Sequence, residues 1–184
     1  IRVFIQHKNS SVIEQKREID IDFLIAVKNE KSNLESLIKS LLKQDVFKQA
    51  SSVRIIIIDD HSDDGSKELL LRLQSQNPEV ILTLNLPDSL KGKKVAIRFG
   101  MEHARDSVLL LDADCRPASE FWATIMLTGL KESDLVLGYG PFFKEPSWLN
   151  RLIRFECMWI AAQYFGWSQK RKPDMGVGRN MAVK

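Results

Sequence analysis

Short, nearly continuous runs of hydrophobic residues alternate along the chain with segments in which hydrophobic residues recur every three or four positions. The continuous runs predict buried strands, and they lie at 21–27, 55–58, 80–84, 108–111, 135–139 and 181–183. The periodic segments predict helices, and they lie at 34–42, 66–76, 93–105, 119–131 and 148–164. This alternation predicts an α/β fold, an open and mostly parallel sheet with helices on both faces and right-handed crossovers.

Polar residues indicate where two of these helices begin. Ser32-Asn33-Leu34-Glu35 has the pattern of a capping box at the start of the first helix. Asp63-Asp64-Gly65-Ser66 predicts a capped start for the second helix.

The chain has 184 residues, the length of one domain. Residues 1–20 are mostly polar and weakly periodic, and we interpret them as a lead-in or linker before a single domain at 21–184. The chain starts at Ile1 rather than at Met, and it ends at Lys184 directly after a predicted strand. We therefore expect a piece of a longer protein, with a domain that is incomplete at its C-terminus.

Composition narrows the class of protein. The residues are 44% hydrophobic and 28% charged, which is ordinary for a globular domain. A net charge of +3 permits an anionic ligand or a membrane surface and does not call for nucleic acid as a partner. Cys115 and Cys157 lie far apart and form no C-x-x-C pair, which argues against a disulfide scaffold or structural zinc. No secretory signal or membrane-spanning stretch is visible, so we expect this piece to be soluble.

Charged residues gather after four of the predicted strands, where ligands bind in open α/β sheets. They lie at 28–30, 59–65, 91–94 and 112–115. Clustered carboxylates need a cation or hydrogen-bond donors to stay ionised. Carboxylate oxygens suit Mg²⁺ or Mn²⁺, and lysines suit phosphates. This edge of the sheet is therefore predicted to hold a metal and a diphosphate.

Each of these motifs also has a simpler interpretation. Asp112-Ala113-Asp114 follows a buried strand directly, yet aspartates are common in turns. Asp59 and Asp60 lie too close to their strand to be natural helix caps, whereas His61 is more typical of a turn residue than of a catalyst. The basic segment 91–94 lacks the G-x-x-x-x-G-K-[ST] pattern of a phosphate-binding loop and is, by itself, typical of a solvated turn.

Together these segments resemble family 2 glycosyltransferases of the GT-A fold, which are inverting enzymes that use nucleotide sugars. The resemblance runs through Phe23-Leu24-Ile25-Ala26-Val27-Lys28-Asn29-Glu30, 53–62, 91–96, Leu110-Leu111-Asp112-Ala113-Asp114 and 178–182. Cys115-Arg116-Pro117 is most similar to membrane-associated bacterial members that build polysaccharides or glycolipids. The resemblance thus implies a cytoplasmic-side location for the whole protein and a glycan or lipid-linked acceptor.

The resemblance also implies roles for individual residues. The backbone near Val27 and the Glu30 side chain would contact the nucleotide, and Asp60 would bind its base, usually uracil, which implies a UDP-sugar donor. Lys94 would approach the diphosphate. Asp112 would face the ribose or the metal, and Asp114 would bind the divalent metal, Mg or Mn. Gly178, Arg179 and Asn180 would line the donor-sugar and acceptor side.

The sequence departs from the family pattern in places. In this family the general base is an aspartate beyond the Gly-x-Asn segment, and the chain ends before any such residue. The catalytic residues are therefore unknown, and the Gln-x-x-Arg-Trp motif of processive members is also absent. Lys28 and Arg98 stand where the family more often has an aromatic residue and an asparagine.

The segment from Trp148 to Trp167 is rich in aromatic residues. Aromatic side chains at helical spacing usually pack inside a core. An amphipathic helix at a membrane surface is the alternative for 148–167, and the basic residues at 170–172 would suit anionic lipid.

Two other functions stay open at this point. A flavodoxin-like phosphoacceptor domain also gathers acidic residues and a lysine around Mg²⁺, although its acidic pair would follow the first strand. The chain could also bind a nucleotide without turnover, since no general base is identified in it.

Overall fold

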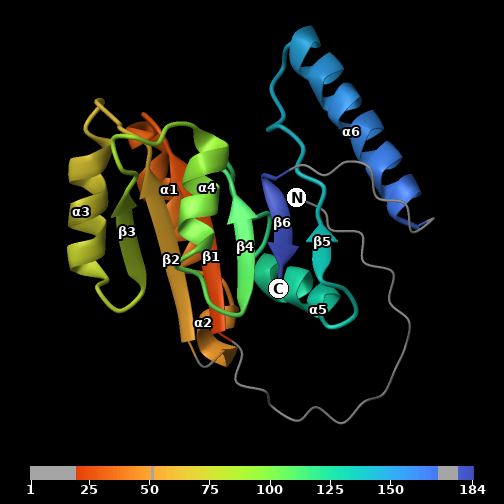
Figure 1. Cartoon of the computed structure of the whole chain (residues 1–184). Coiled ribbons are helices and arrows are strands. Elements are labelled where there is room, and N and C mark those ends of the chain that lie inside the picture. The colour runs from red at the N-terminus through yellow and green to blue at the C-terminus, as the bar shows by residue number, and fades with distance from the viewer. Residues whose placement is uncertain (1–19, 51, 170–177) are drawn as a thin grey trace.

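The computed structural model describes residues 20–50, 52–169 and 178–184. These residues form one six-stranded sheet with the strand order β3-β2-β1-β4-β6-β5 (Figure 1). The strands are β1 (Asp20–Val27), β2 (Ser52–Asp59), β3 (Ile81–Asn85), β4 (Ser107–Leu111), β5 (Leu135–Leu137) and β6 (Asn180–Val183). The helices are α1 (Lys31–Leu41), α2 (Val46–Gln49), α3 (Ser66–Gln76), α4 (Lys93–Met101), α5 (Trp122–Leu130) and α6 (Trp148–Gln169).

The first four strands are parallel, and β6 runs antiparallel to both β4 and β5. Continuous apolar runs form the central strands because both faces of the sheet are covered. This is the mostly parallel α/β sheet that the sequence predicts, with the Rossmann-like arrangement of the GT-A fold.

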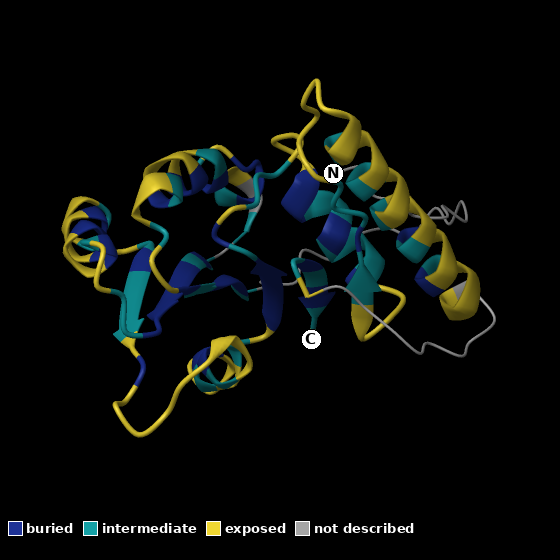
Figure 2. Cartoon of the chain, turned by 90° about the horizontal axis from the view of Figure 1, so that it is seen from above, coloured by how far each residue is buried: buried dark blue, intermediate teal, exposed yellow. Residues whose placement is uncertain are grey.

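Helices cover the two faces unequally. On one face, α1, α3 and α5 pack against alternate residues of the strands, including Phe23 and Ile57. On the other face, α4 is the one helix among the described residues that packs over Leu24, Ile58 and Leu110 (Figure 2). At Gly100 a Cβ atom would lie 2.5 Å from both Leu24 Cδ1 and Ile58 Cδ1, so glycine permits the close approach of α4 to the sheet. This glycine lies near the end of the helix predicted to run over 93–105, which the structure ends at Met101.

Several predicted boundaries were wrong. The capping box was misplaced: Ser32 lies inside α1, and the N-cap residue is Glu30. The second helix, in contrast, was predicted correctly: α3 runs over 66–76, Gly65 at a φ of 86° is its N-cap residue, and Asp64 Oδ1 accepts the backbone N–H of Ser66 (2.9 Å). The predicted helix at 119–131 begins at Trp122, and the four-residue α2 was missed because it is too short to show periodicity.

The predicted lead-in at 1–20 lies outside the described residues except for Asp20, which begins β1. The basic segment 170–172 also lies outside them. Among the helices described, none is both long and apolar enough to cross a membrane.

Candidate functional site

A cavity of about 340 Å³ opens at the carboxyl ends of the parallel strands. Its walls come from the ends of β1, β2 and β4 and from the start of α4. The lining residues are Ala26, Val27, Lys28, Glu30, Asp60, Gly92, Lys93, Asp112, Ala113 and Asp114. The structure therefore brings together five of the predicted site residues, namely Val27, Glu30, Asp60, Asp112 and Asp114.

The loops after β1 and β2 are joined by reciprocal hydrogen bonds. Asn29, at a φ of 56°, donates its backbone N–H to Ser62 Oγ (2.9 Å), and its Oδ1 accepts the N–H of Asp63 (2.9 Å). Glu30 N–H donates to Ser66 Oγ (3.0 Å). These bonds fix the two loops that carry Glu30 and Asp60 relative to each other.

Asp60 is buried, and its carboxylate is held from two sides. Gly92 N–H donates to Oδ2 (3.0 Å), and His61 Nδ1 lies 3.0 Å from Oδ1. Burial by itself raises the pKa of Asp60. The hydrogen bonds from His61 and Gly92 lower it, and they outweigh the effect of burial, so the net pKa lies below the ordinary value. The side chain is thus an ionised acceptor at the wall of the cavity.

Asp112 forms an ion pair across the cavity. Lys93 Nζ lies 2.6 Å from Asp112 Oδ1, and both side chains are partly exposed. Lys94, the lysine expected at the diphosphate, is not among the lining residues; its neighbour Lys93 is. Consecutive residues of a helix point about 100° apart, and at this position the structure turns the first lysine of α4 to the cavity.

Asp114 presents an exposed carboxylate at the cavity wall. Its loop is held by Arg116, whose guanidinium donates to the backbone oxygens of Ala113 (3.1 Å) and Asn33 (2.9 Å). Sequence reasoning missed this structural role of Arg116. Cys115 lies between Asp114 and Arg116 in the sequence. Burial and the neighbouring Asp114 and Asp112 raise the pKa of its thiol to about 11, so the thiol stays protonated.

The carboxylates of Asp112 and Asp114 provide oxygen ligands of the kind that a hard divalent cation prefers. Mg²⁺ usually takes one or two protein carboxylates, with water and substrate phosphate oxygens as further ligands. In the part of the chain that the structure describes, no three His, Cys, Asp or Glu side chains cluster in a way that could hold a metal ion. Asp112 and Asp114 would therefore hold such a cation together with phosphate oxygens rather than as a complete protein cage.

Asn180 is not brought to the cavity. It pairs with Leu111 in the sheet, one residue before Asp112, but its side chain is fully buried. Asn180 Oδ1 accepts the indole N–H of Trp122 (3.0 Å), and its backbone oxygen accepts the N–H of Gly138 (2.8 Å). The residue thus fixes β5, β6 and α5 behind the cavity.

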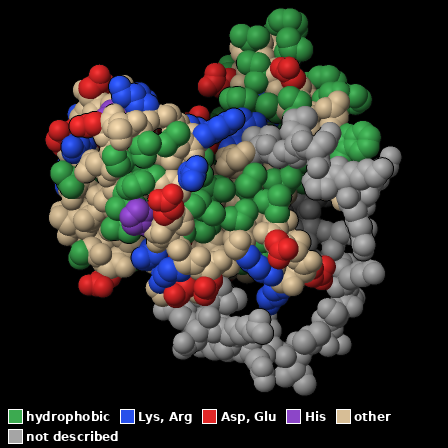
Figure 3. All heavy atoms as spheres, viewed as in Figure 1, with side chains coloured by type: hydrophobic (Ala, Val, Ile, Leu, Met, Phe, Trp, Pro, Cys, Tyr) green, Lys and Arg blue, Asp and Glu red, His purple; other side chains and the backbone are tan. Residues whose placement is uncertain are grey.

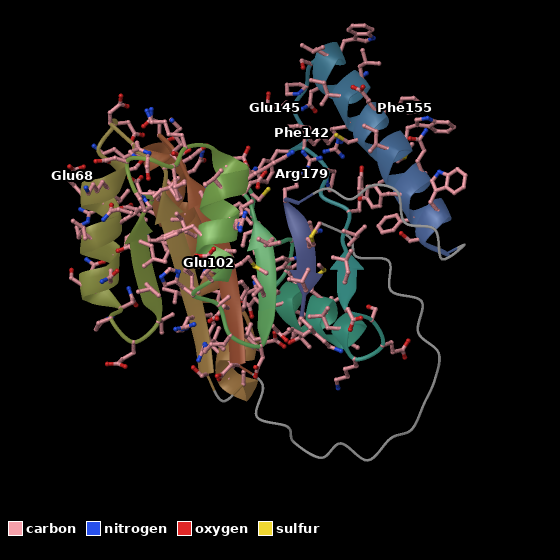
Figure 4. The ribbon with its side chains drawn as sticks, in the orientation of Figure 1. Glu68, Glu102, Phe142, Glu145, Phe155 and Arg179 are labelled. Atoms are coloured by element: carbon pink, nitrogen blue, oxygen red, sulfur yellow. The ribbon has the colours of Figure 1, made fainter. Side chains whose placement is uncertain are left out.

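Arg179 points toward α6 and the loop before it. Its guanidinium carbon lies 5.1 Å from the centre of the Phe142 ring, and one of its nitrogens lies 3.6 Å from Cys157 Sγ (Figure 4). Asp59 is also buried away from the cavity lining, where its Oδ2 accepts the N–H of Ser62 (3.3 Å). Of the neighbouring acids Asp59 and Asp60, only the second faces the cavity.

Comparison with known proteins supplies the family. A sequence model described as Glycosyl transferase family 2 matches residues 22–178. No curated protein sequence matches the chain.

Solved structures share the fold at low identity. A mannosyltransferase from Pyrobaculum calidifontis, in complex with GDP-Man and Mn²⁺, superposes with a TM-score of 0.63 at 18% identity, over 89% of this chain and 44% of that one. Glucosyl-3-phosphoglycerate synthase from Mycobacterium tuberculosis, in complex with UDP, gives 0.58 at 15% identity, over 97% and 63%. TarS 1–349 from S. aureus with UDP-GlcNAc gives 0.55 at 20% identity, over 65% and 34%. The chain spans about a third to two thirds of the length of these proteins.

Proposed function

Because the chain belongs to glycosyl transferase family 2, we propose that it forms the donor-binding part of a glycosyltransferase. The enzyme transfers a sugar from a UDP-sugar to a glycan or lipid-linked acceptor, with inversion at the anomeric carbon and with a divalent metal, Mg²⁺ or Mn²⁺. The observation that carries the proposal is the convergence of Asp60, Lys93, Asp112 and Asp114 on one cavity.

Each lining group has a part in this proposal. Asp60 is ionised and buried, which suits it to accept the N–H of a uracil ring, while the backbone of Val27 and the side chain of Glu30 border the nucleoside. Lys93, rather than Lys94, provides a cation for the diphosphate. Asn180 acts indirectly, by fixing β6 beside Asp112.

The leaving group in this reaction is a nucleoside diphosphate, whose negative charge grows as the bond to the sugar breaks. A divalent metal held by Asp112 and Asp114 supplies charge neutralisation there. Lys93 adds a further positive charge at the same place. The acceptor hydroxyl needs a general base within hydrogen-bond reach, and the proposal assigns that role to no residue of this chain.

The names of the solved structures support a nucleotide sugar as donor, since they include complexes with GDP-Man, UDP-GlcNAc and UDP. The mannosyltransferase complex also contains Mn²⁺. We further propose that the reaction takes place at the cytoplasmic side of a membrane, with residues 148–167 at its surface. The exposed apolar face of α6 supports this placement.

Calorimetric titration of UDP in the presence of Mn²⁺ tests the proposal. The chain is expected to bind UDP, and Asp60→Asn and Asp114→Asn are each expected to weaken binding about 10- to 100-fold, because each removes a charged partner of the ligand. Glu102→Gln, at the far end of α4, is the matched control and is expected to leave the affinity unchanged (Figure 4). Absence of UDP binding, or equal binding by all three variants and the parent chain, would contradict the proposal.

A further inference from the structure

One face of α6 carries a stripe of large apolar side chains that are exposed, because no other described part of the chain covers them. Its members recur at the spacing i, i+4, i+7 and i+11, which places them on one side of a helix. They are Trp148 (74% exposed), Leu152 (47%), Phe155 (58%) and Trp159 (59%).

The opposite face of α6 is the one that holds it to the domain. Ala161 and Tyr164 are buried there, and the Tyr164 hydroxyl donates to the backbone oxygen of Gly138 (3.2 Å). The helix thus has two apolar faces, and the described residues cover one of them (Figure 2). A contiguous exposed apolar patch indicates an interaction surface.

The loop before α6 is tied to the start of the helix by hydrogen bonds. Asn150 is its anchor: its Oδ1 accepts the N–H of Glu145 (3.0 Å) and its Nδ2 donates to the backbone oxygen of Phe143 (3.0 Å). Phe143, 66% exposed, is thereby held next to the start of the helix. We call Trp148, Leu152, Phe155 and Trp159 together the aromatic surface; apolar side chains gather over this part of the molecule in Figure 3.

A cavity of about 480 Å³ with a basic lining lies beside the aromatic surface. Its charged residues are Lys144, Arg151 and Arg154 against the single acid Glu145. Arg154 donates to the backbone oxygen of Phe142 (2.6 Å), which keeps its guanidinium at the cavity. Within the described ranges, none of these three cations forms an ion pair with a carboxylate.

These observations point to an anionic lipid bilayer as the partner. Trp and Phe favour the headgroup region of a membrane, where their rings are partly buried. A nearby cluster of Lys and Arg is attracted to the negative surface of such a bilayer. A second copy of this chain fits less well, because a twofold interface would set the same uncompensated cations against each other.

We infer that the aromatic surface inserts at headgroup depth into an anionic bilayer, while the cavity of Lys144, Arg151 and Arg154 receives a lipid headgroup phosphate. In Figure 1, α6 rises on the side of the sheet where the carboxyl ends of the parallel strands lie. The exposed stripe, to which Phe155 belongs, lies on the side of α6 away from the sheet (Figure 4). The inference rests on the membrane placement of residues 148–167 proposed above, and its test does not depend on sugar transfer.

Vesicle co-sedimentation of the full chain tests the inference. Two vesicle types are used, one of phosphatidylcholine alone and one of phosphatidylcholine mixed with phosphatidylglycerol, each at low and high salt. The chain is expected to sediment with the mixed vesicles at low salt, to sediment much less at high salt, and to stay in solution with phosphatidylcholine alone. Absence of sedimentation with the mixed vesicles at low salt would overturn the inference.

Two pairs of variants locate the contact. Arg151→Glu is expected to weaken binding about 30-fold, since it reverses one charge at the surface, whereas Lys67→Glu on α3 is its control and leaves binding unchanged. The double variant Trp148→Ser/Trp159→Ser is expected to abolish detectable binding, whereas Phe121→Ser removes an equally exposed aromatic residue before α5 without effect.

Circular dichroism and thermal unfolding establish that each variant is folded, so that lost binding reports on the surface. Equal binding by the Arg151 and Trp variants and the parent chain would overturn the inference. So would a concentration-dependent dimer in sedimentation velocity that disappears in the Trp variant, since the aromatic surface would then join two copies. UDP binding is expected to be intact in all of these variants, which separates this test from that of the donor site.

Discussion

Lys93 Nζ lies 2.6 Å from Asp112 Oδ1, so an ion pair joins the first residue of α4 to the residue after β4. Lys93 is 57% exposed and Asp112 is 24% exposed, and ion pairs at this level of exposure contribute little to stability. Both side chains line the cavity at the carboxyl ends of the strands. A metal ion that binds Asp112 would take the place of Lys93 beside that carboxylate, and a diphosphate that binds Lys93 would take the place of Asp112. The two ligands should therefore favour each other's binding.

Replacing Lys93 tests which lysine serves the diphosphate. Lys93→Met is expected to weaken UDP binding about tenfold, because it removes one charge-assisted contact. Lys94→Met, one residue along the helix and outside the lining, is the control and is expected to bind as the parent does. Calorimetry with Mn²⁺ present measures both, and a larger loss in Lys94→Met would return the role to that residue.

Asp22, far from the cavity at the strand ends, is expected to contribute strongly to the free energy of unfolding. It is completely buried in β1, where it accepts hydrogen bonds from Arg54 Nε (2.9 Å) and from Arg105 N–H (2.8 Å). Asp22→Asn is expected to lower the free energy of unfolding by about 3 kcal/mol, because it breaks a buried ion network and removes the carboxylate charge that Arg54 and Arg105 share. Urea denaturation measures this loss. Asp20→Asn is the control, because Asp20 also pairs with Arg105 but is partly exposed, so its replacement should lower the free energy of unfolding far less.

The same carboxylate predicts a pH dependence of stability. Burial raises the pKa of Asp22, but the hydrogen bonds from Arg54 and Arg105 outweigh it, so its pKa in the folded chain lies below its ordinary value of 3.8. Between these two pKa values the unfolded chain binds the proton and the folded chain does not, so stability rises with pH across this window. The contribution is complete above pH 3.8 and is lost as the pH falls through the folded value. Acid titration should show a flatter stability curve for Asp22→Asn in this window; parallel curves would contradict the prediction.

Two glycines should respond oppositely to alanine. In Gly100→Ala the new Cβ would meet Leu24 and Ile58 at 2.5 Å, and overpacking of this kind costs about 1–3 kcal/mol. In Gly166→Ala nothing lies within 4 Å of the new Cβ, and the better helix propensity of alanine should stabilise α6 by up to about 1 kcal/mol. Thermal unfolding of the two variants checks the order, and a neutral Gly100→Ala would show that α4 can move away from the sheet without cost.

The position of the cavity could be predicted from the sequence, because apolar runs mark buried strands and parallel strands end at a common edge. Asp60, Asp112 and Asp114 could be located by that reasoning alone. The choice between Lys93 and Lys94 could not, since one step along a helix turns a side chain away from the site and the pattern of the sequence does not set the rotation of α4. Lys93 does have a signal in the sequence, as the first residue after the turn at Gly92.

Other features depended on long-range packing. The direction of β6 decides that Asn180 meets Trp122 rather than the cavity, and a four-residue strand has no pattern that encodes its direction. Helical spacing in 148–164 predicted α6 correctly, but aromatic residues on every side of a helix do not reveal which side is covered. The contact of Tyr164 with Gly138 and the burial of Ala161 distinguish the inner face from the outer one.

Paramagnetic line broadening in NMR spectra tests the central claim most directly, namely that a metal and a nucleotide share the cavity at the strand ends. Mn²⁺ is added to the isotope-labelled chain with and without UDP, and amide signals that broaden locate the ion. The account predicts that UDP strengthens the broadening and that it centres on 112–116 and 92–93. Broadening centred elsewhere, for example around Glu145, or broadening that UDP does not affect, would contradict it.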